Sequence, residues 1–163
     1  DFSKERPTLI SEMDPAKLCR EVREIMEDKA LEHAIEWEEE IDPGVGTMEG
    51  DYQALRTMLI NLVENAIDAC RLDDRKDCHK IRLACFKDKD KVIFQVEDSG
   101  LGMDHQTREK AFSLFYSTKG EQGTGLGLSN SRQLIRLLGG DLYIKESIPG
   151  QGSTFCFELP LVK

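Results

Sequence analysis

The sequence shows no long apolar run, no signal-peptide pattern in its first residues and no excess of positive charge. None of its hydrophobic stretches approaches the ~20 residues that a transmembrane helix needs. The formal net charge of −9 disfavours binding to nucleic acid or to an anionic membrane surface, because either partner would repel the chain. We therefore expect a cytoplasmic domain that is not itself embedded in a membrane, whether or not the whole protein is anchored in one.

The sequence also lacks any C-x-x-C pair, and its 5 cysteines, an odd number, do not predict a disulfide framework. Free cysteines commonly behave as small apolar residues, and we expect these to be buried. Cys78 and His79 are adjacent, but no further metal ligands stand at a suitable spacing. The three histidines, His33, His79 and His105, are expected at the surface.

The pattern of apolar residues, glycines and prolines predicts one domain of mixed helices and strands in the 163 residues. Residues 1–7 are polar and end in proline, which indicates a linker or the end of a preceding element, and residues 8–163 form the domain. Helices are predicted over 14–30, 51–71 and 128–138, and strands over 8–13, 31–39, 80–87, 91–97, 141–146 and 153–159. Because the later strands form hairpins, we expect an α/β two-layer sandwich.

The helix predicted over 51–71 carries two asparagines beside its apolar stripe. At 100° per residue, Asn61 and Asn65 lie within about 40° of each other around the helix. Asparagine is a poor helix former, so two of them bordering a core face need an explanation. They are either ordinary surface or capping residues, or ligands whose amide oxygens bind a hard cation such as Mg²⁺. The helix alone does not decide between these alternatives.

The strand predicted over 91–97 leads to a carboxylate that faces the core. Its apolar residues share one face, and Asp98 has the same parity. A carboxylate there costs free energy unless it accepts hydrogen bonds, and the glycines that follow, Gly100 and Gly102, allow a close approach of the backbone. Asp98 either caps the next turn or binds a ligand such as a purine ring. An ionised aspartate accepts from the exocyclic amine of adenine, whereas guanine presents an acceptor there.

A glycine-rich segment over 123–128 leads directly into the helix predicted over 128–138. Backbone amides at a helix N-terminus bind anions such as phosphate, although glycine repeats are also common in flexible loops. Apolar anchors at 112–115 precede a polar stretch that includes Lys119. We expect this stretch to be a mobile lid over bound phosphates, with Lys119 as its cationic contact.

Together, four segments resemble the catalytic domain of bacterial sensor histidine kinases. Residues 61–69, 98–102, 112–115 and 123–127 follow the order and spacing of the asparagine box, the D-x-G-x-G motif, the phenylalanine box and the G-x-G-x-G motif. The resemblance covers nearly all of the chain beyond residue 7. It implies the Bergerat-type ATP-binding fold of the gyrase, Hsp90, histidine kinase and mismatch-repair ATPases, in which helices cover one face of a mixed sheet.

The resemblance also implies roles for the candidate residues. Asn65 would bind Mg²⁺ and Asn61 would assist the metal or the phosphates, which makes both catalytic. Asp98 would recognise the adenine of ATP, in a pocket that is lined by Gly102 and Thr154. The complete set of implied nucleotide-binding residues is Asn61, Asn65, Asp98, Gly100, Gly102, Lys119, Gly123, Gly125, Leu126, Gly127, Leu128 and Thr154.

Within this superfamily, the residue at position 61 favours a histidine as phosphate acceptor. ATP-hydrolysing enzymes and anti-sigma serine kinases typically place a glutamate four residues before the metal-binding asparagine, where it acts as a general base. Asn61 stands there instead, and a neutral imidazole needs no strong base because it already offers a lone pair near pH 7. We therefore predict transfer of the γ-phosphate to a histidine in two-component signalling. The alternative is an ATP-hydrolysing conformational ATPase or an anti-sigma serine kinase of the same superfamily.

Two features depart from the family pattern. Asp68 stands where the family often carries a basic residue that contacts phosphate, and none of the three histidines is followed by the acidic residue usual after a phosphoacceptor. Residues 1–3 resemble the end of the dimerisation helix of these kinases. The expected partners are therefore a histidine-bearing dimerisation domain upstream and the receiver domain of a response regulator.

Overall fold

The fold is built on one mixed sheet. In the computed structural model, which describes residues 9–113 and 125–161, five strands form this sheet in the order β2 (Ile35–Ile41), β4 (His79–Asp88), β5 (Lys91–Asp98), β7 (Gly152–Pro160) and β6 (Asp141–Ile148). β2 pairs with β4 in parallel, and the other neighbouring strands are antiparallel. A separate antiparallel pair joins β1 (Ser11–Met13) to β3 (Met48–Gly50).

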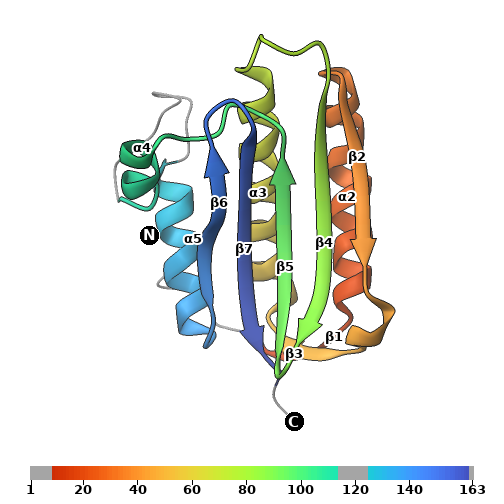
Figure 1. The fold of residues 1–163 in the computed structure, drawn as a ribbon. Helices are drawn as coiled ribbons and strands as arrows, with labels where there is room; N and C mark the ends of the chain where they lie inside the picture. Colours follow the sequence, from red (N-terminus) through yellow and green to blue (C-terminus); the bar gives the residue numbers. More distant parts are fainter. Residues whose placement is uncertain (1–8, 114–124, 162–163) are drawn as a thin grey trace.

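Helices cover one face of the sheet, as Figure 1 shows. The long ones among the described residues are α2 (Pro15–Glu32), α3 (Tyr52–Arg71) and α5 (Gly125–Leu137). The short α4 (His105–Lys110) lies beside the β6 edge, where Arg108 Nη2 donates to the Ile144 carbonyl at 2.8 Å. A single 3₁₀ turn, η1 (Pro43–Val45), follows β2. The predicted α/β two-layer sandwich with helices on one face is confirmed.

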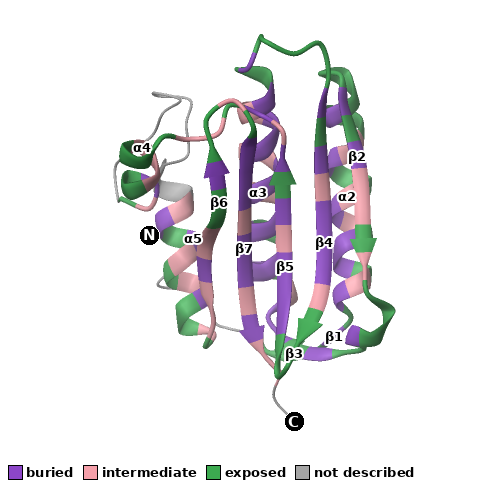
Figure 2. Cartoon of the chain, in the orientation of Figure 1, coloured by how far each residue is buried: buried purple, intermediate pink, exposed green. Residues whose placement is uncertain are grey.

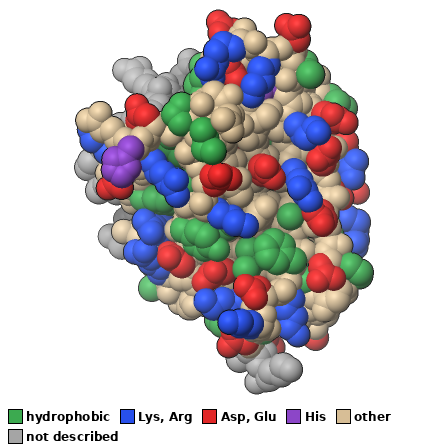
Figure 3. All heavy atoms as spheres, in the orientation of Figure 1, with side chains coloured by type: hydrophobic (Ala, Val, Ile, Leu, Met, Phe, Trp, Pro, Cys, Tyr) green, Lys and Arg blue, Asp and Glu red, His purple; other side chains and the backbone are tan. Residues whose placement is uncertain are grey.

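The hydrophobic core lies between the helices and the sheet (Figure 2). Phe94 of β5 and Phe157 of β7 are register partners on the core face, and their rings stack with centroids 4.7 Å apart. Leu55 and Leu59 of α3 are fully buried against this layer, as the apolar periodicity of the helix predicts. The opposite face of the sheet carries acidic, basic and apolar side chains side by side (Figure 3).

Most predicted elements exist, and the errors are shifted element ends and two short elements that were not predicted. The helix α3 and the strands β4, β5 and β7 differ from prediction by one residue at most at each end. The start of the strand predicted over 31–39 is wrong, because α2 continues to Glu32 and the chain turns at Ala34, whose φ is 59°. No glycine or proline marks this helix end in the sequence. The helix predicted from Leu128 begins at Gly125, and β3 and η1 were not predicted.

Two predictions about burial are also corrected. Cys78 is exposed in the polar connection between α3 and β4, whereas Cys19, Cys70, Cys85 and Cys156 are buried as expected. His33 and His105 are exposed, but His79, at the start of β4, is only 7% exposed. No helix in the described parts of the chain is long and apolar enough to cross a membrane. The predicted linker, residues 1–7, lies outside the described residues.

Candidate functional site

Asp98 ends β5 on the face of the sheet that packs against the helices. It is 6% exposed, and its Oδ1 accepts a hydrogen bond from the Gly100 amide at 2.8 Å. Burial raises the pKa of the Asp98 carboxyl to about 6, while backbone hydrogen bonds from Gly100 and Ser153 and the charge of His79 oppose that rise. An ionised carboxylate has about four acceptor positions, so these two backbone hydrogen bonds are compatible with a ligand at the same group.

The neighbour of Asp98 on β7 is Ser153, which the sequence analysis missed. In the β5–β7 register Ser153 lies opposite Asp98, whereas Thr154 lies opposite Glu97 and therefore faces the other side of the sheet. Ser153 Oγ is 2.8 Å from Ser147 Oγ, which also accepts from the Met103 amide at 2.8 Å. The structure thus does not bring Thr154 to Asp98. Strand parity would have indicated Ser153 if the β5–β7 register had been known.

The glycines after Asp98 fit the turn tightly between α3 and the hairpin of β6 and β7. A Cβ on Gly100 would lie 2.5 Å from the Ala69 carbonyl carbon, at the end of α3. Gly102 has a φ of +69°, and a Cβ there would lie 2.0 Å from the Ile148 carbonyl oxygen. Backbone therefore does approach Gly100 and Gly102 closely, as predicted. The approaching groups belong to the protein itself, at the end of α3 and in the hairpin of β6 and β7.

Asn61 and Asn65 lie on α3, which leads to this turn. The helix begins after Asp51, whose Oδ1 accepts from the Ala54 amide at 3.1 Å. Both asparagines are half-buried, beside the fully buried apolar stripe. One turn beyond Asn65, the Ala69 carbonyl accepts from the Leu101 amide at 3.2 Å, which fixes the Asp98 turn to this end of the helix.

The acidic residues around Asn65 are directed elsewhere. Glu64 Oε2 lies 3.8 Å from Lys29 Nζ of α2, so Glu64 faces the neighbouring helix. Asp68 Oδ1 lies 3.6 Å from Arg71 Nη1 on its own helix, and both groups are partly exposed. Glu64 and Asp68 each therefore have a basic side chain within ion-pair distance.

The glycine-rich segment is described only in part. Gly125 to Leu128 form the first turn of α5, and Leu128 is half-buried against the core. Lys119, Gly123 and most of the predicted lid lie outside the described residues. On the two sides of that gap, Arg132 of α5 lies over the Phe112 ring, with its guanidinium carbon 4.4 Å from the ring centroid.

The described residues offer oxygen donors but no ready-made metal cluster. No group of three or more histidine, cysteine, aspartate or glutamate side chains in these parts of the chain could hold a metal ion. The amides of Asn61 and Asn65 fit a hard cation that takes its other ligands from phosphate and water, as Mg²⁺ commonly does. A metal bound there would arrive with a phosphorylated ligand.

Comparison with known proteins identifies the family. The family model described as histidine kinase-, DNA gyrase B- and HSP90-like ATPase matches residues 50–163. The signal transduction histidine-protein kinase AtoS of Escherichia coli is 28% identical over 162 residues, which cover 99% of this chain and 26% of AtoS. The chain thus spans about a quarter of the length of that relative.

Solved structures agree with this assignment. The catalytic domain of histidine kinase ThkA superposes with a TM-score of 0.81 at 33% identity, covering 94% of this chain and 96% of that one. ThkA in complex with the response regulator TrrA gives a TM-score of 0.80 at 31% identity, over 99% of this chain and 44% of that one. Full-length ShkA in complex with AMPPNP superposes with a TM-score of 0.84 at 28% identity, covering 97% of this chain and 32% of that one. The chain therefore belongs to the histidine kinase-, DNA gyrase B- and HSP90-like ATPase family, as the ATP-binding catalytic domain of a histidine kinase.

Proposed function

We propose that this domain, residues 8–163, binds ATP with Mg²⁺ and transfers the γ-phosphate to a histidine on a separate dimerisation domain. The observation that carries the proposal is the buried Asp98 carboxylate, at a turn that is docked on the end of the asparagine-bearing helix α3. A buried carboxyl with a raised pKa is typical of functional sites, and the relatives of the chain are histidine kinases.

Base recognition is the part of the proposal that rests on Asp98. The carboxylate would accept a hydrogen bond from the exocyclic amine of adenine, and guanine would present an acceptor to it instead. Ser153 takes the place of Thr154 as the β7 residue that we expect in the pocket, because it shares the face of Asp98. The likeness to ShkA, whose structure holds AMPPNP, supports an adenine nucleotide as the ligand.

In this proposal, side chains of α3 bind the metal and the first turn of α5 binds phosphate. Asn65 would hold Mg²⁺ through its amide oxygen, with Asn61 assisting, and the metal would neutralise charge on the phosphates. The backbone amides at the first turn of α5, from Gly125, would hold phosphate with the help of the helix dipole. By resemblance, Gly123 and Lys119 complete this set.

We infer a histidine as the phosphate acceptor from the absence of a general base at position 61. Water and serine must lose a proton to attack phosphorus, whereas a neutral imidazole already carries a lone pair. Asn61 offers no base, and Glu64 is paired with Lys29. ATP hydrolysis and serine phosphorylation are therefore less favoured. The complex of ThkA with TrrA supports a response regulator as the partner that takes the phosphate onward.

Nucleotide selectivity tests the binding half of the proposal. We expect the chain to bind ATP in calorimetry and to bind GTP much more weakly. Asp98→Asn should lose up to about a hundredfold in ATP affinity, because an amide presents donors where acceptance is needed and leaving a buried partner unpaired costs ~1–3 kcal/mol. The control is Glu97→Gln, an equivalent change at the exposed neighbour. Equal affinity of the wild-type chain for ATP and GTP would contradict the assignment.

A further inference from the structure

Arg132, in the middle of α5, joins three elements of the fold through its side chain. Its guanidinium carbon lies 4.4 Å from the centre of the Phe112 ring, just beyond the end of α4. Its Nε lies 3.5 Å from Asp141 Oδ1, at the start of β6. Figure 1 shows α4, α5 and β6 side by side at one edge of the fold. We call Phe112, Arg132 and Asp141 the Arg132 network, and none of the proposed nucleotide-binding residues belongs to it.

Asp141 holds Arg132 from the side of the sheet. Its Oδ1 also accepts from Arg136 Nε and from the Leu142 amide, each at 2.9 Å. Burial opposes ionisation of this carboxyl, but the hydrogen bonds from Arg136 and the Leu142 amide outweigh burial and lower the pKa of Asp141 below its ordinary value of 3.8. Asp141 is therefore negatively charged near pH 7 and attracts the Nε end of the Arg132 guanidinium.

Phe112 holds Arg132 from the side of α4. The ring is partly buried and packs against the hydrophobic core, and the Ser113 amide donates to the Lys110 carbonyl at 2.9 Å, which fixes the turn around Phe112. The face of an aromatic ring attracts a guanidinium, more strongly where water is partly excluded. The Arg132 side chain is only 29% exposed, so this contact is a partly shielded one that joins the end of α4 to α5.

The Arg132 network lies close to the proposed phosphate site. Gly125 begins α5, and Arg132 follows about two turns later, ~10 Å along the helix. Helical side chains tilt toward the N-terminus, so the Arg132 guanidinium lies over the turn that separates it from the first one. Functional groups must be held closely in place, since a misplacement of ~1 Å can cost about a hundredfold in rate. An anchor at Arg132 therefore restrains the first turn of α5.

We propose that Arg132 is a positioning residue of the phosphate site, which holds the first turn of α5 in place by joining Phe112 to Asp141. The inference rests on the proposed function, because that function assigns the phosphates of ATP to this turn. The role differs from a direct contact with phosphate, since the ring and the carboxylate already engage the guanidinium.

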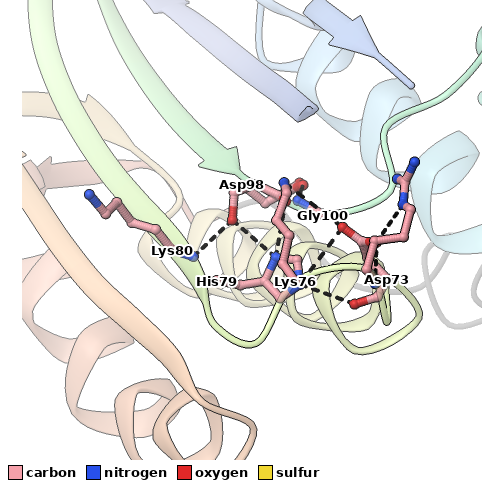
Figure 4. A network of polar contacts seen from close by, with 8 residues as sticks. Asp73, Lys76, His79, Lys80, Asp98 and Gly100 are labelled. Carbon is pink, nitrogen blue, oxygen red and sulfur yellow. Dashed lines mark hydrogen bonds and ion pairs between the residues drawn. The ribbon is translucent and has the colours of Figure 1, made fainter. Parts of the chain in front are cut away.

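The base-recognition part of the proposed site is built from other residues. Asp98 and Gly100 lie beside a polar cluster of the α3–β4 connection (Figure 4). The contacts of Arg132 with the described parts of the chain are with Phe112 and Asp141, and none is with this group. Adenosine, which has the base of ATP but no phosphate, should therefore bind independently of Arg132.

The test compares ATP and adenosine by NMR titration with Mg²⁺, followed at the Gly100 amide, in the wild-type chain and in Arg132→Met. Methionine keeps an unbranched side chain and removes the charge and the donors. We expect ATP affinity to fall about tenfold, as for loss of a partly shielded cation–π contact, and adenosine affinity to stay within about twofold. Arg136→Met is the matched control, because it removes the other arginine from Asp141 and should leave both affinities near wild type.

The outcomes separate this inference from the proposed function. Equal losses for ATP and adenosine in Arg132→Met would show a general disturbance of the fold and would overturn the inference. An unchanged ATP affinity in that variant, or an equal loss in Arg136→Met, would also overturn it while leaving the proposed function in place. Absence of ATP binding by the wild-type chain would refute the proposed function and this inference together.

A double-mutant cycle with Phe112→Leu shows whether Arg132 acts through the ring. Phe112→Leu alone should weaken ATP binding by a similar factor, and adding Arg132→Met should cause less than about a twofold further loss, because the two residues share one contact. Losses that multiply in the double variant would show that Arg132 acts independently of Phe112, for example as a phosphate ligand, and would contradict the inference.

If Arg132→Met does not fold, the Nε–H signal of Arg132 in the wild-type chain decides. We expect this NMR signal to shift when ATP is added and to stay in place with adenosine, because phosphate alone engages the first turn of α5. A signal that does not respond to ATP, or that responds equally to adenosine, would overturn the inference.

Discussion

At the scale of single residues, Asp98 combines a proposed function with a cost in stability. Its pKa rises from an ordinary value of 3.8 to about 6 because the folded chain buries it. A raised carboxyl pKa means that ionisation disfavours the folded state, so the cost is present above about pH 6 and disappears as the pH falls toward the unfolded value. The fold would therefore be more stable above pH 6 if this side chain carried no charge.

The free energy of unfolding of Asp98→Asn, compared with that of the wild type, should reveal the cost of burying the Asp98 charge. Near pH 7.5 we expect the variant to be at least as stable as wild type, by up to about 3 kcal/mol, since one pKa unit corresponds to about 1.4 kcal/mol. The difference should shrink between pH 6 and pH 4. Urea unfolding at several pH values measures it. A variant that is much less stable than wild type at pH 7.5 would show that Asp98 serves the fold rather than the ligand.

Asn65 carries the metal prediction. Asn65→Ala should abolish the part of ATP affinity that depends on Mg²⁺ and leave the helical content unchanged, because the side chain borders the core without filling it. Calorimetry with and without Mg²⁺ measures the first effect and circular dichroism the second. Gln53→Ala, at an exposed amide about three turns earlier on the same helix, is the control. A variant that retains the wild-type dependence on Mg²⁺ would refute the role of Asn65.

At the scale of elements, the position of Asp98 depends on how its turn docks against α3. Gly100→Ala would place a Cβ 2.5 Å from the Ala69 carbonyl carbon and 2.7 Å from the Cys70 amide nitrogen, both rigid helix backbone. We expect a loss of about 1–3 kcal/mol in stability, as in other overpacked sites, together with weaker ATP binding. Thermal unfolding and calorimetry measure the two effects.

The matched control for this element is Gly44→Ala. A Cβ there meets only the Asp42 side chain, at 3.2 Å, on an exposed turn. This variant should keep wild-type ATP affinity and most of its stability. If Gly100→Ala behaves in the same way, the docking of the turn on α3 does not position Asp98.

The elements that could be predicted from the sequence are those whose signal is local. The apolar stripe of α3, the alternation of β5 and the Asp14–Pro15 helix start depend on neighbouring residues, and all were found. Ser153 and His79 were missed because their places depend on strand register and on the α3–β4 connection, which are contacts between distant segments. The end of α2 was missed because Ala34 adopts a positive φ that is usual for glycine.

At the scale of the whole molecule, the proposed function makes this chain one half of a reaction site, with the acceptor histidine on another domain. Asp98, the end of α3 and the hairpin of β6 and β7 meet at one end of the sheet (Figure 1). The net charge of −9 would repel ATP from most of the surface, so binding must rely on local backbone amides, a metal ion and a few side chains. The exposed histidines, His33 and His105, are not followed by the acidic residue usual for an acceptor.

Phosphotransfer in trans tests the central claim most directly. With ATP that is radiolabelled in its γ-phosphate, the isolated chain should neither label itself nor hydrolyse ATP appreciably, since Asn61 replaces the base that would activate water. Addition of the cognate dimerisation domain should produce a label that is acid-labile and base-stable, as expected of phosphohistidine. The yield will be modest, because a covalent tether normally supplies an effective concentration of ~mM. Rapid hydrolysis by the chain alone, or acid-stable labelling of a serine-bearing partner, would contradict the histidine kinase function.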